Sequence, residues 1–155
     1  MLSFKNKFIT KVGVPVFKCP ALPFIHIFKM TNRPKKRISL SENGIGTKDD
    51  PVYLTAHRGA WTDAPQNSLP AFKKSVELGY YTAECDIRLT KDNKWVVLHN
   101  DTVDSLFCQK GKIEDITYDE VRTFTYKYGP NFWTYKDLKI CSFEEFLDVF
   151  VGTNT

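Results

Sequence analysis

Long uncharged apolar runs are missing from the amino-terminal part of this 155-residue sequence. A helix that crosses a membrane needs about 20 consecutive, mostly apolar residues, and no window there provides them. Lysines and three prolines (Pro15, Pro20 and Pro23) interrupt the apolar stretches. These stretches are also short for the core of a secretory signal. The sequence therefore predicts neither a membrane-spanning helix nor a secretion signal at this end.

Paired cysteine motifs are missing as well. The four cysteines are widely spaced, with no C-x-x-C among them, which excludes the usual zinc-binding spacings and a disulfide scaffold. They are interpreted as mainly buried thiols in a reducing compartment. The sequence is 42% hydrophobic and 14% aromatic, which is enough for a packed core. These proportions indicate a folded protein over most of the length.

Positive charge is concentrated at one end. Residues 1–50 carry a net charge of +7 and residues 51–155 a net charge of −3, which together give the overall +4. The polar, glycine-rich stretch "SENGIGTKDDP" at 41–51 predicts a boundary near residue 50. We therefore expect a basic leader and linker over 1–50, followed by a folded domain over 51–155.

Two interpretations of the leader stay open. Its aromatics, its lysines and the cluster "RPKKR" at 33–37 would suit peripheral contact with an anionic membrane surface. The alternative is a poorly ordered extension that packs on its own domain. Nucleic acid is not an expected partner, because the domain behind the leader is acidic. We expect a cytoplasmic protein, with membrane association as an option.

Hydrophobic patterning predicts alternating strands and helices. "VYLTA" at 52–56 is a short strand, and a helix follows from Asn67 or Ser68 to Gly79, which supply N-cap and C-cap residues. Strands are expected at 80–90 and 94–99. Capping-box patterns open two further helices, at 117–129 and 142–150.

The two strands around "KDNK" predict a hairpin. If Asp92 and Asn93 form a two-residue loop, Asp86 lies opposite His99 and Glu84 lies opposite Asp101. Opposed residues of an antiparallel pair point to the same face. Alternation along the strand then directs Cys85 and Ile87 to the other face.

Two interpretations of these acids also stay open. Two carboxylates and an imidazole at one end of a sheet could hold a hard divalent cation and leave a base for chemistry. An ordinary half-buried hairpin with charges facing water is the alternative. His57, which ends the strand at 52–56, is followed by Arg58 and Gly59. An arginine there suits a phosphate, although a core or capping histidine is a simpler explanation for His57 alone.

The motifs together resemble the glycerophosphodiester phosphodiesterase family. "AHRGAWTDAPQNSLPAFKKSVELGY" and "AECDIRLTKDNKWVVLHND" are similar, in order and spacing, to that family's His-Arg-Gly, Pro-Glu-Asn, Ala-Phe helix, Glu-x-Asp, Thr-x-Asp-Gly turn and His-Asp. The resemblance extends from residue 52 to about residue 150. It is far more specific than any one motif.

The resemblance implies an α/β fold, the first strands and helices of a (β/α)₈ TIM barrel with a β-hairpin extension, related to phosphatidylinositol-specific phospholipase C. It implies hydrolysis of glycerophosphodiesters to glycerol 3-phosphate and an alcohol, in lipid metabolism, with Ca²⁺ or Mg²⁺. Glu84 and Asp86 would ligate the metal, His57 and His99 would be the general acid and base, and Arg58 would hold the phosphate. The cation would activate the substrate's 2-hydroxyl, which attacks phosphorus, and water would then open the cyclic phosphate.

The sequence departs from the family pattern at several positions. Gln66 stands where the family usually has Glu, and Asn100 where it has Asp; both changes remove negative charge, so we expect weaker metal affinity. Asn93 replaces the turn glycine, which should be harmless because Asn tolerates the left-handed conformation. The family's third metal ligand, a Glu on the next barrel strand, has no counterpart, since Glu144 and Glu145 fall on a helix.

Length is the largest departure. A complete barrel needs about 250 residues, so the chain is expected to be the amino-terminal part of such an enzyme, truncated and with doubtful activity of its own. The alternative is an inactive remnant that acts as a membrane-binding or partner-binding module through residues 1–50.

Overall fold

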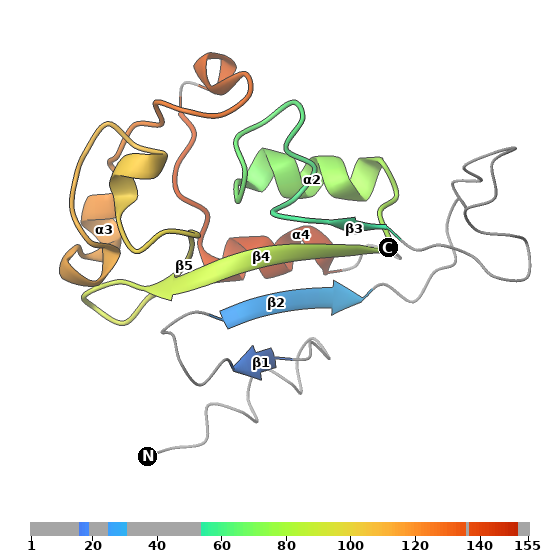
Figure 1. Ribbon diagram of the computed structural model, residues 1–155, viewed down its shortest axis with the longest axis horizontal. Coiled ribbons are helices and arrows are strands. Elements are labelled where there is room, and N and C mark those ends of the chain that lie inside the picture. The colour runs from blue at the N-terminus through green and yellow to red at the C-terminus, as the bar shows by residue number, and fades with distance from the viewer. Residues whose placement is uncertain (1–15, 19–24, 31–53, 136, 152–155) are drawn as a thin grey trace, which may run out of the picture.

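A five-stranded sheet organises the described part of the protein, for which a computed structural model gives residues 16–18, 25–30, 54–135 and 137–151. The strands are β1 (Val16–Lys18), β2 (Ile25–Met30), β3 (Thr55–Ala56), β4 (Thr82–Leu89) and β5 (Trp95–Val97). They run in the order β1-β2-β4-β3, and β5 also pairs with β4 (Figure 1). The central strand β4 therefore has β2 along one edge, and β3 followed by β5 along the other.

The strands β3 and β4 are parallel and are joined through the helix α2 (Leu69–Glu77). The Ser68 side chain accepts a hydrogen bond from the backbone N–H of Ala71 and caps this helix, as one of the two predicted N-caps requires. Gly79 follows the last turn with a φ of 73°, the left-handed conformation that ends many helices. The helix predicted from Asn67 or Ser68 to Gly79 is thus confirmed.

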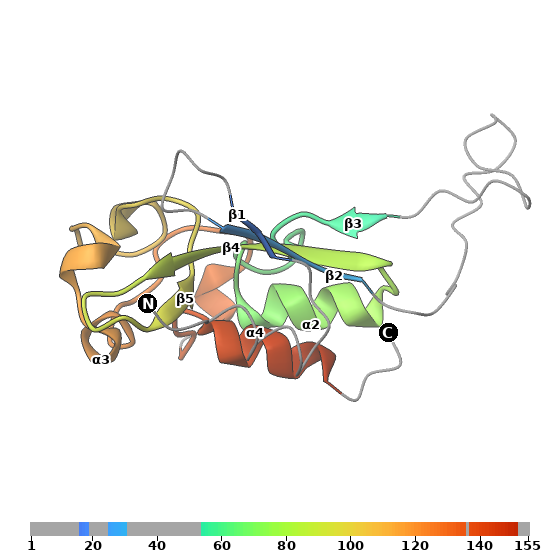
Figure 2. The same ribbon diagram turned by 90° about the horizontal axis from the view of Figure 1, so that it is seen from below.

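The main core lies between the sheet and the helices α2 and α4 (Phe143–Phe150), which cover the same face (Figure 2). Ser142 and Glu145 form the predicted capping box, with both reciprocal hydrogen bonds present. The rings of Phe72 and Phe146 meet edge to face with centroids 4.7 Å apart, a favourable aromatic geometry. This packing holds α2 and α4 together beneath β4.

A second core lies at the far end of β5. It contains Val96, Leu98 and Phe107 and is enclosed by the short helices η1 (Val103–Ser105), η2 (Ile113–Asp115), α3 (Tyr118–Val121) and η3 (Phe132–Thr134). Because Val97 belongs to the first core while its two neighbours belong to the second, β5 separates the two cores.

The helix predicted over 117–129 is wrong beyond its first turn. Thr117 does cap α3 through the backbone N–H of Glu120, as expected, but the helix ends at Val121. The following "TFTY" is β-branched and aromatic, which disfavours a helix. Tyr126 instead forms a β-bridge with Phe107, so tertiary pairing replaces the helix.

The predicted hairpin exists, but its register is shifted by one residue. Thr90 pairs with Lys94 across a three-residue loop, not a two-residue one. Asn93 occupies the left-handed position of this loop with a φ of 60°, a common three-residue hairpin geometry. The backbone carbonyl of Asp86 therefore accepts a hydrogen bond from the backbone N–H of Leu98, and the prediction that His99 lies directly opposite Asp86 is wrong.

Two strands of the basic leader join the sheet. β1 and β2 form an antiparallel pair, and β2 pairs antiparallel with β4. All other residues of 1–50 lie outside the described residues, so the boundary at residue 50 and the membrane contact stay predictions. Within the described residues, no helix is both long enough and apolar enough to cross a membrane.

Two of the three described cysteines are buried, Cys85 and Cys141, whereas Cys108 is exposed. All three are free thiols. Burial raises the pKa of the Cys85 thiol and of the Cys141 thiol, which keeps both uncharged near neutral pH.

Candidate active site

The loop after β3 forms one wall of the site. Its residues Arg58 and Gly59 both have left-handed backbones, with φ values of 58° and 78°. The loop packs tightly on α2, where the backbone N–H of Ala60 donates to the carbonyl of Ala71 at 3.0 Å. A Cβ added at Gly59 would lie 2.8 Å from the backbone carbon of Ala71. Only glycine fits this close approach.

Replacing Gly59 with alanine is expected to destabilise the protein by about 1–3 kcal/mol beyond the backbone strain of a positive φ. Gly79 is the matched control, because its φ of 73° imposes similar strain while nothing lies within 4 Å of an added Cβ. Urea unfolding of both variants measures the difference. Equal losses for the two variants would show that the loop does not pack on α2 as described.

Glu84 and Asp86 form the floor of the site. Their side chains are buried, at 2% and 0% exposure, and they lie two residues apart on β4. Cys85 and Ile87 belong to the helix-side core, so the two acids face the opposite side of the sheet. The predicted alternation is present. The proximity of two buried carboxylates requires compensating positive charge or hydrogen-bond donors.

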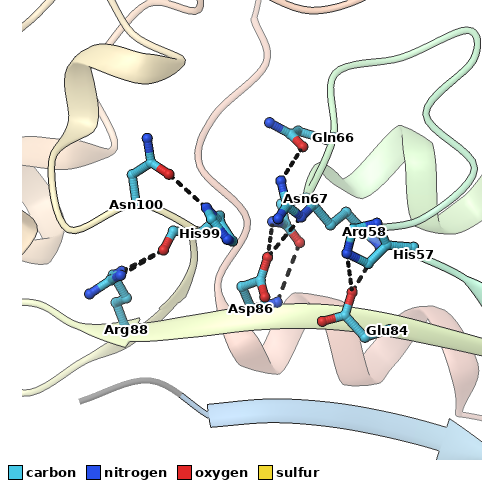
Figure 3. A network of polar contacts seen from close by, with 9 residues as sticks. All are labelled: His57, Arg58, Gln66, Asn67, Glu84, Asp86, Arg88, His99 and Asn100. Atoms are coloured by element: carbon cyan, nitrogen blue, oxygen red, sulfur yellow. Dashed lines mark hydrogen bonds and ion pairs between the residues drawn. The ribbon is translucent and has the colours of Figure 1, made fainter. Parts of the chain in front are cut away.

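Arg58 supplies that compensation (Figure 3). Its backbone N–H donates to Glu84 Oε2 at 3.0 Å, and its Nε lies 3.2 Å from Asp86 Oδ2. Its Nη1 donates to Gln66 Oε1 at 2.8 Å. The sequence predicted that Arg58 binds a phosphate. In the structure its side chain lies between the carboxylate of Asp86 and the amide of Gln66.

Asn67 is a site residue that the sequence analysis considered only as a helix cap. It is fully buried, its Nδ2 donates to Asp86 Oδ2 at 3.0 Å, and its Oδ1 accepts from the backbone N–H of Asp86 at 3.4 Å. Its left-handed φ of 55° is a conformation that asparagine tolerates better than most residues. The Pro-Gln-Asn motif at 65–67 was the signal that could have identified it.

The two histidines belong to different loops. His57 is largely exposed, with 64% of its side chain accessible, and its Nε2 lies 3.9 Å from Glu84 Oε2. His99 is half-buried, and its Nδ1 lies 2.6 Å from Asn100 Oδ1. In Figure 3 Asp86 and Asn67 lie between the two rings. The structure therefore places an imidazole on each side of the acids.

Arg88 is a second residue that the sequence analysis missed. Its Nε and Nη2 donate to the backbone carbonyl of His99 at 2.9 and 2.7 Å. Burial lowers the pKa of this guanidinium, and the carboxylates of Asp101, Asp86 and Glu114 oppose that effect. The bidentate contact attaches the loop of His99 to β4. It holds this loop in place beyond the end of β5 at Val97.

The oxygen donors suit a hard divalent cation only in part. Glu84 and Asp86 are carboxylates on one face of a strand, the ligand type that Ca²⁺ and Mg²⁺ prefer. No group of three or more His, Cys, Asp or Glu that could hold a metal occurs among the described residues. The site thus offers two acid ligands, with Arg58 already on one of them.

A family model matches residues 57–155, which contain all five predicted site residues, and it describes the glycerophosphoryl diester phosphodiesterase family. The chain belongs to this family. The match includes the loop after β3, the acids of β4 and the loop of His99. The resemblance seen in the sequence is confirmed.

Known relatives agree. The glycerophosphodiester phosphodiesterase of Caldanaerobacter subterraneus subsp. tengcongensis is 39% identical over 83 residues, which are 52% of this chain and 34% of that protein. Among solved structures, the glycerophosphodiester phosphodiesterase of Agrobacterium tumefaciens has a TM-score of 0.55 at 20% identity, covering 65% of this chain and 42% of that one. An Oleispira antarctica phosphodiesterase, solved with the product sn-glycerol-3-phosphate, has a TM-score of 0.53 at 20% identity over 63% and 39%.

These structural matches show the fold. The small mixed sheet and the helices are consistent with part of an α/β barrel of the (β/α)₈ type, as predicted. The chain spans about a third of the length of the Caldanaerobacter relative and about two fifths of the length of the solved ones.

Proposed function

We propose that this site takes part in the hydrolysis of glycerophosphodiesters to glycerol 3-phosphate and an alcohol, in lipid metabolism. One observation supports the proposal most: two buried carboxylates, Glu84 and Asp86, lie between two loops that each present a histidine. Membership of the family and the names of the relatives support the same substrate class.

The histidines are proposed to move protons. Imidazole has an unperturbed pKa of about 6.5 and can give or accept a proton near neutrality. Exposed His57 is accessible to a substrate hydroxyl or leaving alcohol, and its Nε2 lies 3.9 Å from Glu84 Oε2. The contact with Asn100 and the fixed backbone carbonyl orient the ring of His99. Each imidazole would thus serve as acid in one step and base in the other.

Arg58 is proposed to bind the phosphate with part of its guanidinium. A guanidinium carries five N–H donors. Asp86 lies beside its Nε, whereas the contact of Nη1 with Gln66 adds no further negative charge, because Gln66 is a neutral amide. The side chain is 19% exposed, so one edge can reach a ligand. Gln66 would then orient Arg58 without lowering its affinity for an anion.

Glu84 and Asp86 are proposed to hold Ca²⁺ or Mg²⁺. When bound, the cation would polarise the phosphate and acidify the attacking hydroxyl. The Nε of Arg58 already lies 3.2 Å from Asp86, so a cation and this guanidinium would compete for the same carboxylate. This competition, together with only two acid ligands, supports the expectation of weak metal affinity.

Release of glycerol phosphate from glycerophosphocholine by the 155-residue chain is expected to require Ca²⁺ or Mg²⁺ and to stop on addition of EDTA. Because charge on the ligands sets affinity for hard ions, Glu84→Gln should raise the metal concentration needed for half-maximal rate about tenfold or more. An enzyme-coupled assay of glycerol phosphate measures both. The exposed carboxylate of Asp119 provides the control variant, Asp119→Asn.

Failure of the chain to release glycerol phosphate at any metal concentration would contradict the proposed activity. The alternative is an inactive remnant that binds a membrane or a partner, and the guanidinium on Asp86 favours it by occupying the position of a cation. Isothermal titration with Ca²⁺ and Mg²⁺, and sedimentation with anionic liposomes with and without residues 1–50, distinguish the two. No metal uptake, with lipid binding lost on deletion, would support the alternative.

A further inference from the structure

In a (β/α)₈ barrel, a parallel strand would pair along the edge of β4 that faces β2 here. Every strand of such a barrel pairs with a parallel strand on each side. β4 has its parallel neighbour β3 on one side, but on the other side it has β2, which runs antiparallel. A strand of the leader therefore lies where the barrel fold requires a parallel strand.

The pairing between β2 and β4 is extensive. Six consecutive residues of each strand are in register, from Ile25 opposite Ile87 to Met30 opposite Thr82. Thr82 to Ile87 are all buried. An unpaired edge along such a buried strand would invite association with other chains, so β2 protects this edge.

The hydrogen bonds of Asp86 show which backbone groups of β4 point toward β2. The N–H of Asp86 reaches Asn67, and its carbonyl accepts from Leu98, so Asp86 faces β3 and β5. Because backbone groups alternate along a strand, Ala83, Cys85 and Ile87 face β2.

The connection between β2 and the rest of the domain is long enough for β2 to leave. Residues 31–54 separate β2 from β3, and a chain of that length extends to roughly 80 Å. β2 can therefore detach without moving β3, whereas β3 and β5 are tied to β4 through the site loops and the hairpin.

We propose that β2 is a displaceable strand that covers the edge of β4 where a (β/α)₈ barrel has a parallel strand. The antiparallel pair of β1 and β2 closes this edge in one state, and the edge is open when β2 detaches. This proposal rests on the fold and not on the proposed activity.

A crosslink tests the register. Ile27 lies opposite Cys85, and opposed residues of an antiparallel pair have Cα atoms about 4.5–5.5 Å apart, within the range that a disulfide spans. In a chain with Cys19→Ser and Cys108→Ser, Ile27→Cys should crosslink to Cys85 at alkaline pH under a chemical oxidant. The matched control Phe28→Cys, opposite Glu84, should not.

Hydrogen exchange tests displacement. In the reduced Ile27→Cys chain, the amides of Ala83, Cys85 and Ile87 should exchange at least about tenfold faster than that of Arg88, because β2 opens without unfolding of the domain. Oxidation should slow these three amides at least about tenfold. Equal exchange in the reduced and oxidised chains would overturn displacement.

A proline variant serves as a second measurement. Ile27→Pro removes a donor that faces β4 and should speed exchange at the same three amides at least about tenfold, whereas Lys35→Pro, elsewhere in the leader, should not. The pairing of β2 with β4 is overturned if neither cysteine variant crosslinks and Ile27→Pro leaves the exchange unchanged.

Discussion

Replacing His57 with alanine is expected to lower the rate of glycerol phosphate release about 10²–10⁴-fold, the usual contribution of a positioned acid or base. The free energy of unfolding should change by no more than about 0.5 kcal/mol, as for other surface substitutions, because 64% of the side chain is exposed. Measuring turnover and urea unfolding on the same preparation separates catalysis from folding.

Lys94→Ala is the control for this variant, because Lys94 is also exposed and basic but lies at the hairpin loop, away from the site. Its turnover should equal that of the unsubstituted chain. If His57→Ala retained full turnover, His57 would have no catalytic role. If it lost stability together with turnover, His57 would be a structural residue of the loop after β3.

Replacing Asp86 with alanine is expected to cost about 3–5 kcal/mol of stability, the range for breaking a buried ion pair by removal of one partner. The variant leaves the largely buried guanidinium of Arg58 without its carboxylate and the Nδ2 of Asn67 without its acceptor. Such a loss is a large share, at least about a fifth, of the 5–15 kcal/mol that typically stabilise a domain. Urea unfolding, at low and at high salt, measures it.

A second substitution tests whether the unpaired charge of Arg58 causes this loss of stability. Adding Arg58→Met to Asp86→Ala removes the uncompensated charge, so the double variant should recover part of the lost stability. Together with the single variant Arg58→Met, the values give the coupling energy of the pair. Glu77→Ala is the control, because Glu77 forms an exposed ion pair with Lys74 and should change stability little. Equal effects of Asp86→Ala and Glu77→Ala would contradict a buried pair between Arg58 and Asp86.

Local signals predicted the local structure well. The capping residues Ser68 and Ser142 begin helices where expected, because a cap depends on residues only two or three positions away. Alternation along β4 placed Glu84 and Asp86 on one face for the same reason. Pairing with a distant segment is different. Tyr126 forms a β-bridge with Phe107, and the helix expected over 117–129 does not extend to it.

The residues of the turn did not determine the register of the hairpin. The loop contains Asp92 and Asn93, which suit both a two-residue and a three-residue turn. The structure has the three-residue form, in which Asp92 Oδ1 accepts from Thr90 Oγ1 and from the backbone N–H of Tyr118. A contact 26 residues away thus favours the longer loop, and the loop in turn moves His99 away from the position opposite Asp86.

The sequence by itself determined the family, the strand and helix order around the site, and which acids, histidines and arginine gather there, since these depend on motif spacing and on short-range periodicity. Only the tertiary structure decided how the charges meet. It brought Arg58 onto Asp86, buried Asn67 beneath them and placed β2 on the edge of β4. These contacts join segments that lie far apart in the sequence, where the cost of burying charge and of leaving a strand edge unpaired selects the partner.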